Sequence, residues 1–173
     1  MKLTLLTLAC ALLVPAAPFA QTFTIPDRIE KLSAKAKESV NVTLDGPLLQ
    51  LAGQFLNSGK DNERSAKEIV SKLRGIHVRS FEFAKEGEYT EADLEAIRSQ
   101  LKSPAWTRVV DSREEGEHSQ IFVKQENGML GGVVILAAER MELSIVSIDG
   151  PIDLKQLSNL AGKFGIPSVP TQK

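Results

Sequence analysis

The side chains best suited to acid–base or metal chemistry gather in one short stretch, residues 111–118, between two predicted strands. Its candidate binding residues are Asp111, Glu114, Glu115 and His118. Carboxylates beside an imidazole can hold a divalent cation or transfer a proton. The spacing matches no calcium-binding loop, however, and Glu117 and His118 would point to opposite faces of a strand. A solvated hairpin loop is the favoured interpretation, and a metal-dependent or acid–base hydrolase is the alternative.

The chain has two histidines, and the other one is His77. It alternates with Ile76 and Val78 in a predicted strand, so we expect its ring at the solvent or at the edge of the sheet. A single strand histidine brings no partner motif with it, and His77 is therefore only a weak binding candidate. We assign no catalytic residue, no metal ligand and no cofactor from the sequence.

Phosphate-binding and nucleophile motifs are not matched. Residues 53–61 have five residues between their two glycines where a phosphate loop has four, and Asp61 stands where that loop needs Ser or Thr. There is no Gly-x-Ser-x-Gly elbow in the sequence. The single cysteine, Cys10, lies in a predicted leader, so we expect no cysteine nucleophile in the mature chain. These patterns favour a protein that is not an enzyme.

An export signal is expected over residues 1–20. Lys2 gives a short positive start, an apolar run follows, and small residues lead to Ala20, where we expect cleavage, with cleavage after residue 16 or 17 as alternatives. Lipid attachment at Cys10 is disfavoured because the apolar run continues well beyond it. We expect a periplasmic or secreted protein with no stable membrane span in the mature chain, and a lipid-anchored envelope protein is the disfavoured alternative.

The rest of the chain predicts a single α+β domain over residues 21–165, followed by a frayed tail at 166–173. A net charge of −1 gives no basic field for nucleic acid. Apolar spacing predicts about five helices, over 25–36, 48–55, 66–73, 90–101 and 151–165, and about six strands, over 40–44, 76–83, 106–112, 120–125, 129–138 and 142–148. We expect an antiparallel or mixed sheet with helices mainly on one face, a two-layer sandwich.

Several local signals sharpen this prediction. We expect a capping box at Thr90 and Asp93, a tight hairpin at 127–128 and a bulge or close backbone approach at 131–132. A bulge near Arg79 or Ser80 would bring all the apolar residues of 76–83 to one core face. Asp-Gly-Pro occurs at both 45–47 and 149–151, which predicts a strand passing into a helix at each place.

The order of several blocks resembles a bacterial family of exported proteins classified as a domain of unknown function, DUF4252. These blocks are DGPLLQLA at 45–52, SFEF at 80–83, YTEADL at 89–94, WTRVVDSR at 106–113, GGVVILA at 131–137 and ELSIVSIDGPIDL at 142–154. The likeness runs from about Arg28 to Phe164. It implies an envelope protein, in some members a lipoprotein, linked with envelope stress or sigma/anti-sigma signalling, and it brings no catalytic motif.

The function expected from these observations is a non-catalytic module that binds a protein or peptide partner. An unpaired edge of the predicted sheet could accept an added strand. A small ligand in the crevice between sheet and helices is a further alternative. The oligomeric state, the partner and the order of the strands stay open.

Overall fold

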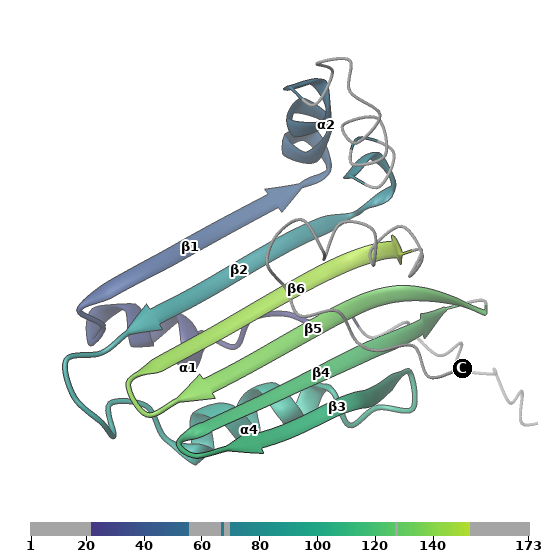
Figure 1. Ribbon diagram of the computed structural model, residues 1–173. Helices are drawn as coiled ribbons and strands as arrows, with labels where there is room; N and C mark the ends of the chain where they lie inside the picture. The colour runs from purple at the N-terminus through teal and green to yellow at the C-terminus, as the bar shows by residue number, and fades with distance from the viewer. Residues whose placement is uncertain (1–21, 56–66, 68–69, 127, 153–173) are drawn as a thin grey trace, which may run out of the picture.

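The structure is a computed structural model that describes residues 22–55, 67, 70–126 and 128–152. Its framework is an open antiparallel sheet of six strands in the order β1-β2-β6-β5-β4-β3 (Figure 1). The strands are β1 (Glu38–Asp45), β2 (Gly75–Glu82), β3 (Trp106–Glu114), β4 (Glu117–Glu126), β5 (Met129–Glu139) and β6 (Glu142–Ile152). The predicted α+β class and strand number are confirmed.

The last four strands form an antiparallel meander. Each is joined to the next by a tight connection, and Gly116 and Gly128 supply the positive φ angles of 82° and 77° in the first two connections. Strand β6 pairs with β2, so β1 and β3 are the two outer strands. The register of β4 against β5 shifts between Lys124 and Gln125, opposite the predicted irregularity at 131–132.

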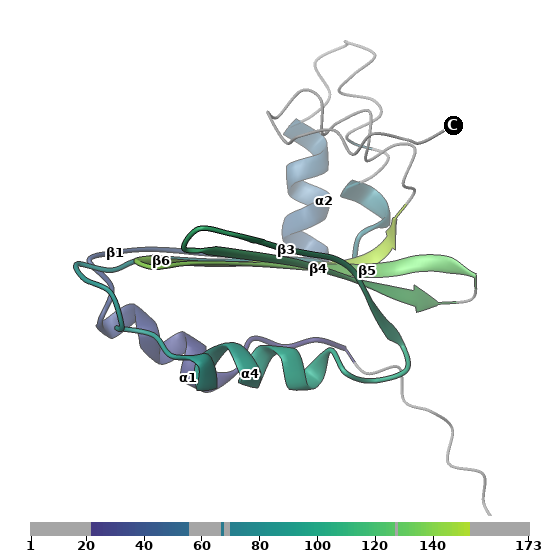
Figure 2. The same cartoon turned by 60° about the horizontal axis from the view of Figure 1, so that its bottom comes forward.

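The described helices lie on both sides of the sheet (Figure 2). They are α1 (Asp27–Glu30), continued by a 3₁₀ turn at Lys31–Ala34, then α2 (Gly46–Phe55) and α4 (Glu91–Gln100). Helices α1 and α4 cover one face, here called the helix face, whereas α2 rises from the end of β1 on the other side, here called the open face. Of the predicted helix at 66–73, the structure describes residues 67 and 70–73, and residues 67 and 70–72 are helical. None of the described helices is long and apolar enough to span a membrane.

The main core lies between the helix face and helices α1 and α4. Its largest buried side chains are Phe81, Ile29, Ile97, Leu136, Leu143 and Ile145. Trp106, 8% exposed, closes the core at the start of β3. Strand residues reach this core at every second position, which is the pattern that a sheet with one covered face requires.

The predicted bulge in β2 is wrong. The strand pairs without interruption with β1 and with β6 over Gly75–Glu82. Phe81 therefore points to the helix face, while Ile76 and Val78 lie half-buried on the open face. The sequence argument assumed one apolar face, but this sheet is apolar on both, so no extra residue is needed.

The predicted helix start at Pro151 is also wrong. Strand β6 continues through Gly150 and Pro151 to Ile152, which pairs with Leu130. Proline is tolerated there because the register of β5 against β6 shifts between Leu130 and Gly132, and proline fits at such an irregularity. The rest of that predicted helix lies outside the described residues.

Candidate functional site

A cavity of about 540 Å³ opens between the start of α4 and the β3–β4 hairpin. Tyr89, Thr90 and Glu91 line it from the α4 side, and Glu114 and His118 line it from the hairpin. The capping box fixes the α4 side, because the Asp93 carboxylate accepts hydrogen bonds from the Thr90 backbone at 2.8 Å and from its hydroxyl at 2.7 Å. Two of the candidate residues therefore share a preformed hollow.

His118 is held from both sides of its ring. Its Nε2 lies 2.7 Å from Oδ1 of Asp111, and its Nδ1 lies 3.2 Å from Nη2 of Arg98. Arginine has only hydrogen-bond donors, so Nδ1 accepts from Arg98, and Nε2, which contacts the Asp111 carboxylate, also lies 3.3 Å from Nε of Arg113. Arg98 is itself fixed, since its Nε donates to Oε1 of Gln120 at 2.7 Å.

The hydrogen bond between His118 and Asp111 also affects the pKa of the Asp111 carboxyl. Donation from His118 is the largest influence, and it holds the pKa of the Asp111 carboxyl below its usual range. Partial burial works against this, and the nearby charges of Arg108 and Arg113 reinforce it. The carboxylate is therefore ionised at neutral pH, and it ties the hairpin strand that carries His118 to β3.

This arrangement is better suited to holding the hairpin than to catalysis. Both ring nitrogens of His118 are already engaged, so neither is free to take a proton from a bound substrate. Over the described ranges, no three or more His, Cys, Asp or Glu side chains are grouped so as to hold a metal ion. The geometry gives no specific support to the hydrolase alternative.

The remaining predicted candidates are placed differently. Glu115 is exposed in the turn between β3 and β4. His77 is half-buried in β2, an inner strand, where it pairs with Thr43 and Ser147. The structure therefore groups Asp111, Glu114 and His118 and leaves out His77. Glu117 and His118 occupy opposite faces, as their adjacency on a strand predicts.

About half of the residues that line the cavity were not predicted from the sequence. Its additional charged lining residues are Glu86, Glu91, Glu117, Glu139, Arg113 and Arg140. Tyr89 joins the two halves, because its hydroxyl donates to the backbone oxygen of Glu139. The α4 side lies more than twenty positions before the hairpin in the sequence, and only the capping signal at Thr90 marked it. The meander brings these distant segments together.

The two outer strands of the sheet differ in how they are protected. Strand β1 pairs with β2 in unbroken register over its eight residues, and it contains neither proline nor lysine. Strand β3 has a register shift between Arg108 and Val110, and Arg108 is ion-paired with Asp111 at 2.9 Å. Bulges and charges are the usual protection of a sheet edge, so β1 is the more accessible edge for pairing.

Comparison with known proteins identifies one family. A protein-family model described as "Domain of unknown function (DUF4252)" matches residues 33–160. The comparison with curated proteins finds no match. The matched range contains the whole described sheet and α4, and it therefore includes both the cavity and the β1 edge.

Proposed function

The chain belongs to the DUF4252 family, and we propose that it is an exported envelope protein that binds a peptide segment of a partner protein as an added strand beside β1. In strand addition, main-chain hydrogen bonds supply affinity, and alternate side chains supply specificity. The resemblance of the sequence to exported proteins favours a role in envelope stress or sigma/anti-sigma signalling. The leader at residues 1–20 favours the periplasm as the place of binding.

The observation that carries this proposal is the unprotected outer edge of β1. Seven of its eight residues are exposed, and Val40 and Val42 are 52% and 36% exposed on the open face. Ser39, Asn41 and Thr43 face the other way. A partner strand with apolar side chains on one face and polar side chains on the other therefore fits this edge.

Contacts on the helix face also hold β1 in place. Arg79 of β2 donates from Nη1 to the backbone oxygen of Val42 at 3.1 Å, and the same guanidinium is ion-paired with Glu30 of α1. An edge that is already ordered before binding loses little conformational entropy when a partner adds to it. The geometry thus favours β1 over a mobile segment as a peptide template.

Site-specific crosslinking tests the proposal. A photoreactive residue at Asn41 should crosslink a partner in the bacterial envelope, and the same residue at Val109 on the β3 edge, 54% exposed, is the matched control. A synthetic peptide of the crosslinked segment should then bind the purified protein and slow amide exchange in β1. Asn41→Lys should weaken that binding about tenfold or more, because a lysine on a sheet edge opposes pairing, whereas Val109→Lys should not. Equal effects of the two lysines, or equal crosslinking at both positions, would refute the proposal.

The cavity beside α4 favours a small-ligand function as a second candidate. Its volume of about 540 Å³ falls within the range of about 300–1,000 Å³ that small-molecule sites occupy. Native mass spectrometry of freshly purified protein should then show a ligand-bound species that Glu91→Gln reduces. Detection of the ligand-free mass alone would count against this function.

A further inference from the structure

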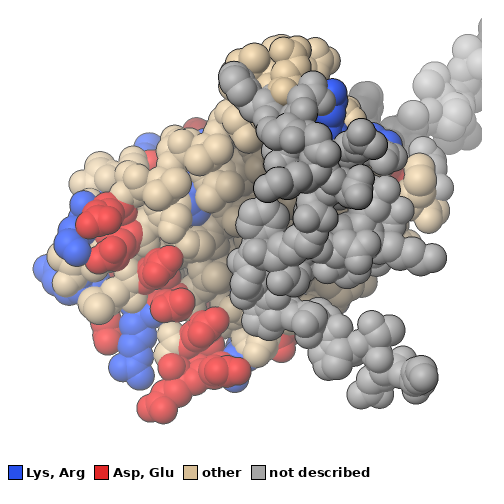
Figure 3. Space-filling view, turned by 45° about the horizontal axis from the view of Figure 1, so that its top comes forward, with Lys and Arg blue, Asp and Glu red and all other residues tan. Residues whose placement is uncertain are grey.

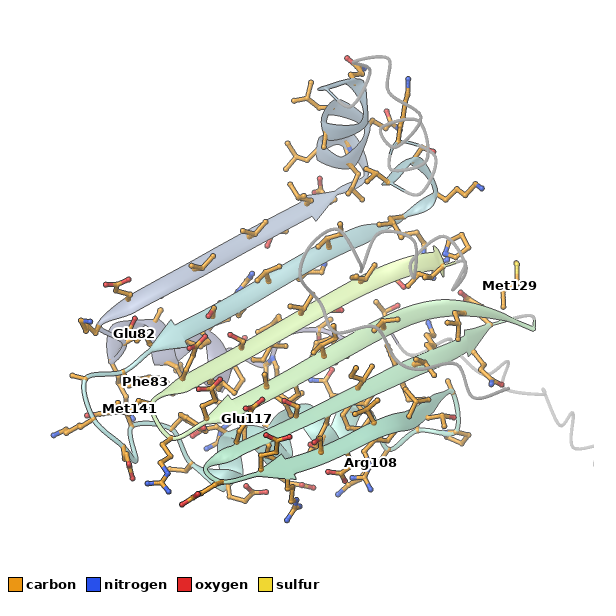
Figure 4. All side chains as sticks on the ribbon, in the orientation of Figure 1. Glu82, Phe83, Arg108, Glu117, Met129 and Met141 are labelled. Carbon is orange, nitrogen blue, oxygen red and sulfur yellow. The ribbon has the colours of Figure 1, made fainter. Side chains whose placement is uncertain are left out.

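The open face carries a row of acidic side chains across the whole sheet. The register pairs Glu38 with Glu82 and Glu82 with Glu142, and it pairs Glu139 with Glu117 and Glu117 with Glu114. Glu139 and Glu142 flank the two-residue turn between β5 and β6. The glutamate row is therefore Glu38, Glu82, Glu142, Glu139, Glu117 and Glu114, and all of these side chains are exposed. Figure 4 shows Glu82, at the end of β2, and Glu117, at the start of β4, at the same end of the sheet.

The next two rows of residues on the open face differ in the size of their side chains. The row beside the glutamates is mostly small, with Val40, Ser80, Ser144, Ala137, Ser119 and Ser112. The row beyond it is entirely β-branched, with Val42, Val78, Val146, Ile135, Ile121 and Val110. This row of small side chains, here called the furrow, has glutamates on one side and apolar branches on the other.

The acidic side chains lean toward this furrow. Ser119 donates to the Glu117 carboxylate at 3.0 Å, and Ser144 donates to the Glu142 carboxylate at 3.3 Å. Figure 3 shows acidic and basic groups together along one border, beside a stretch of uncharged residues. Among the described residues, Lys37 is the one cation that ion-pairs with the glutamate row, at 2.8 Å from Glu82 and 3.9 Å from Glu38.

Like charges directly opposite each other on neighbouring strands destabilise a sheet. A row of six glutamates in which only Glu38 and Glu82 have a described ion pair, both with Lys37, is therefore a surface that a cationic partner would stabilise. The acidic border repels nucleic acid and anionic lipid. The adjoining β-branched row requires that the partner also carry apolar side chains.

We propose that this part of the open face is a docking surface for an amphipathic, basic α-helix of a partner protein, lying in the furrow across the strands. Neighbouring strands are about 4.8 Å apart, and same-face residues of a helix, three or four positions apart, are about 5–6 Å apart. Lysine or arginine along one side of such a helix can therefore meet successive glutamates, while its apolar stripe meets the β-branched row. An extended chain repeats a face only every ~7 Å and matches the strands less well.

A designed peptide pair tests this proposal independently of the β1 edge. The probes are an 18-residue amphipathic leucine–lysine helix and the same pattern with glutamate in place of lysine. The mature chain should bind the lysine peptide alone, and the triple variant Glu82→Gln, Glu117→Gln and Glu142→Gln should weaken that binding about tenfold. Glu95→Gln, on α4 behind the sheet, is the matched control and should leave binding unchanged.

A change of furrow shape separates docking from simple charge attraction. Ser119→Tyr leaves the charge unaltered but fills the furrow, so it should also weaken binding of the lysine peptide, with circular dichroism used to confirm the native fold. Equal binding to all folded variants, binding of the glutamate peptide, or binding that arises only after removal of residues 153–173 would overturn the proposal. Asn41→Lys should not alter this binding, so failure here and failure of strand addition at β1 are distinguishable.

Discussion

Arg79 of β2 and Glu30 of α1 form a bidentate ion pair beneath the sheet. Nη2 of Arg79 lies 2.8 Å from Oε1 of Glu30, and its Nε lies 3.0 Å from Oε2. The Arg79 side chain is only 9% exposed, whereas that of Glu30 is 38% exposed. The guanidinium also bonds the backbone oxygens of Val42 and Val78, so one side chain connects α1, β1 and β2.

Loss of the carboxylate should therefore cost stability. Glu30→Gln leaves the Arg79 charge largely buried without its counter-charge, and we expect the free energy of unfolding to fall by about 1–3 kcal/mol. Combining it with Arg79→Met should cost less than the sum of the single changes, because the two side chains act on each other. Urea unfolding measures all three variants. Glu95→Gln, which removes an exposed carboxylate, should change stability by less than about 0.5 kcal/mol, and an equal loss there would contradict the prediction.

Asp93 is expected to be a second stabilising carboxylate. Its burial acts to raise its pKa, but hydrogen bonds from Thr90 and Arg28 outweigh burial and hold the pKa below the usual range. Asp93→Ala removes the cap of α4 and the pairing with Arg28, and it should lower the free energy of unfolding by about 1–2 kcal/mol at neutral pH. The loss should be smaller with Asp93→Asn, which keeps a hydrogen-bond acceptor.

The pH dependence of Asp93 has a definite sign. A carboxyl whose pKa is lower in the folded state stabilises the fold above its unfolded pKa of about 3.9, and the stabilisation is lost as pH falls through the folded pKa. The difference in unfolding free energy between wild type and Asp93→Asn should therefore be constant near neutral pH and shrink below about pH 4. A difference that grows on acidification would show that Asp93 does not act through its charge.

The sequence was a reliable guide at some local signals but not at all of them. The capping box at Thr90 and the irregularity at 131–132 were both predicted from residues close in the chain. The errors concern non-local facts. Whether β2 needs a bulge depends on how the second face of the sheet is used, and whether Pro151 starts a helix depends on the partner strand beside it.

The candidate site was found only in part for the same reason. The hairpin half was visible as a run of carboxylates ending in His118, but the engagement of that ring by Arg98 requires α4 to lie against β4. The glutamate row is invisible along the chain because its members are spread from Glu38 to Glu142 and line up only through strand register. Register depends on the pairing of all strands together.

Lys124 is expected to be a site where a polar side chain reduces stability. It is 3% exposed on β4, between Trp106 and Gly132 of the neighbouring strands. Among the described residues, no carboxylate is ion-paired with its amine. Lys124→Met keeps the length of the side chain and removes the buried charge, so the free energy of unfolding should rise by about 1–3 kcal/mol. A loss of stability in Lys124→Met would mean that the amine has a stabilising partner.

Gly150, the glycine of β6, should not accept a side chain without a loss of stability. Its φ is 134°, and an added Cβ would lie 2.7 Å from Cα of Leu73 and 3.0 Å from the backbone nitrogen of Arg74. That segment cannot retreat freely, because Arg74 donates its backbone N–H to Asp149 at 2.8 Å and pairs with the Asp149 carboxylate at 3.0 Å. Gly150→Ala should therefore reduce the free energy of unfolding by more than about 2 kcal/mol.

Gly87 provides the matched control for Gly150. Its φ is also positive, at 83°, but an added Cβ would meet no atom within 4 Å. Gly87→Ala should then cost only the backbone penalty of about 1–2 kcal/mol. Thermal and urea unfolding of both variants separate the steric contribution from the conformational one. If the two substitutions cost the same, the close approach of β6 to the Leu73–Arg74 segment contributes nothing to the penalty at Gly150.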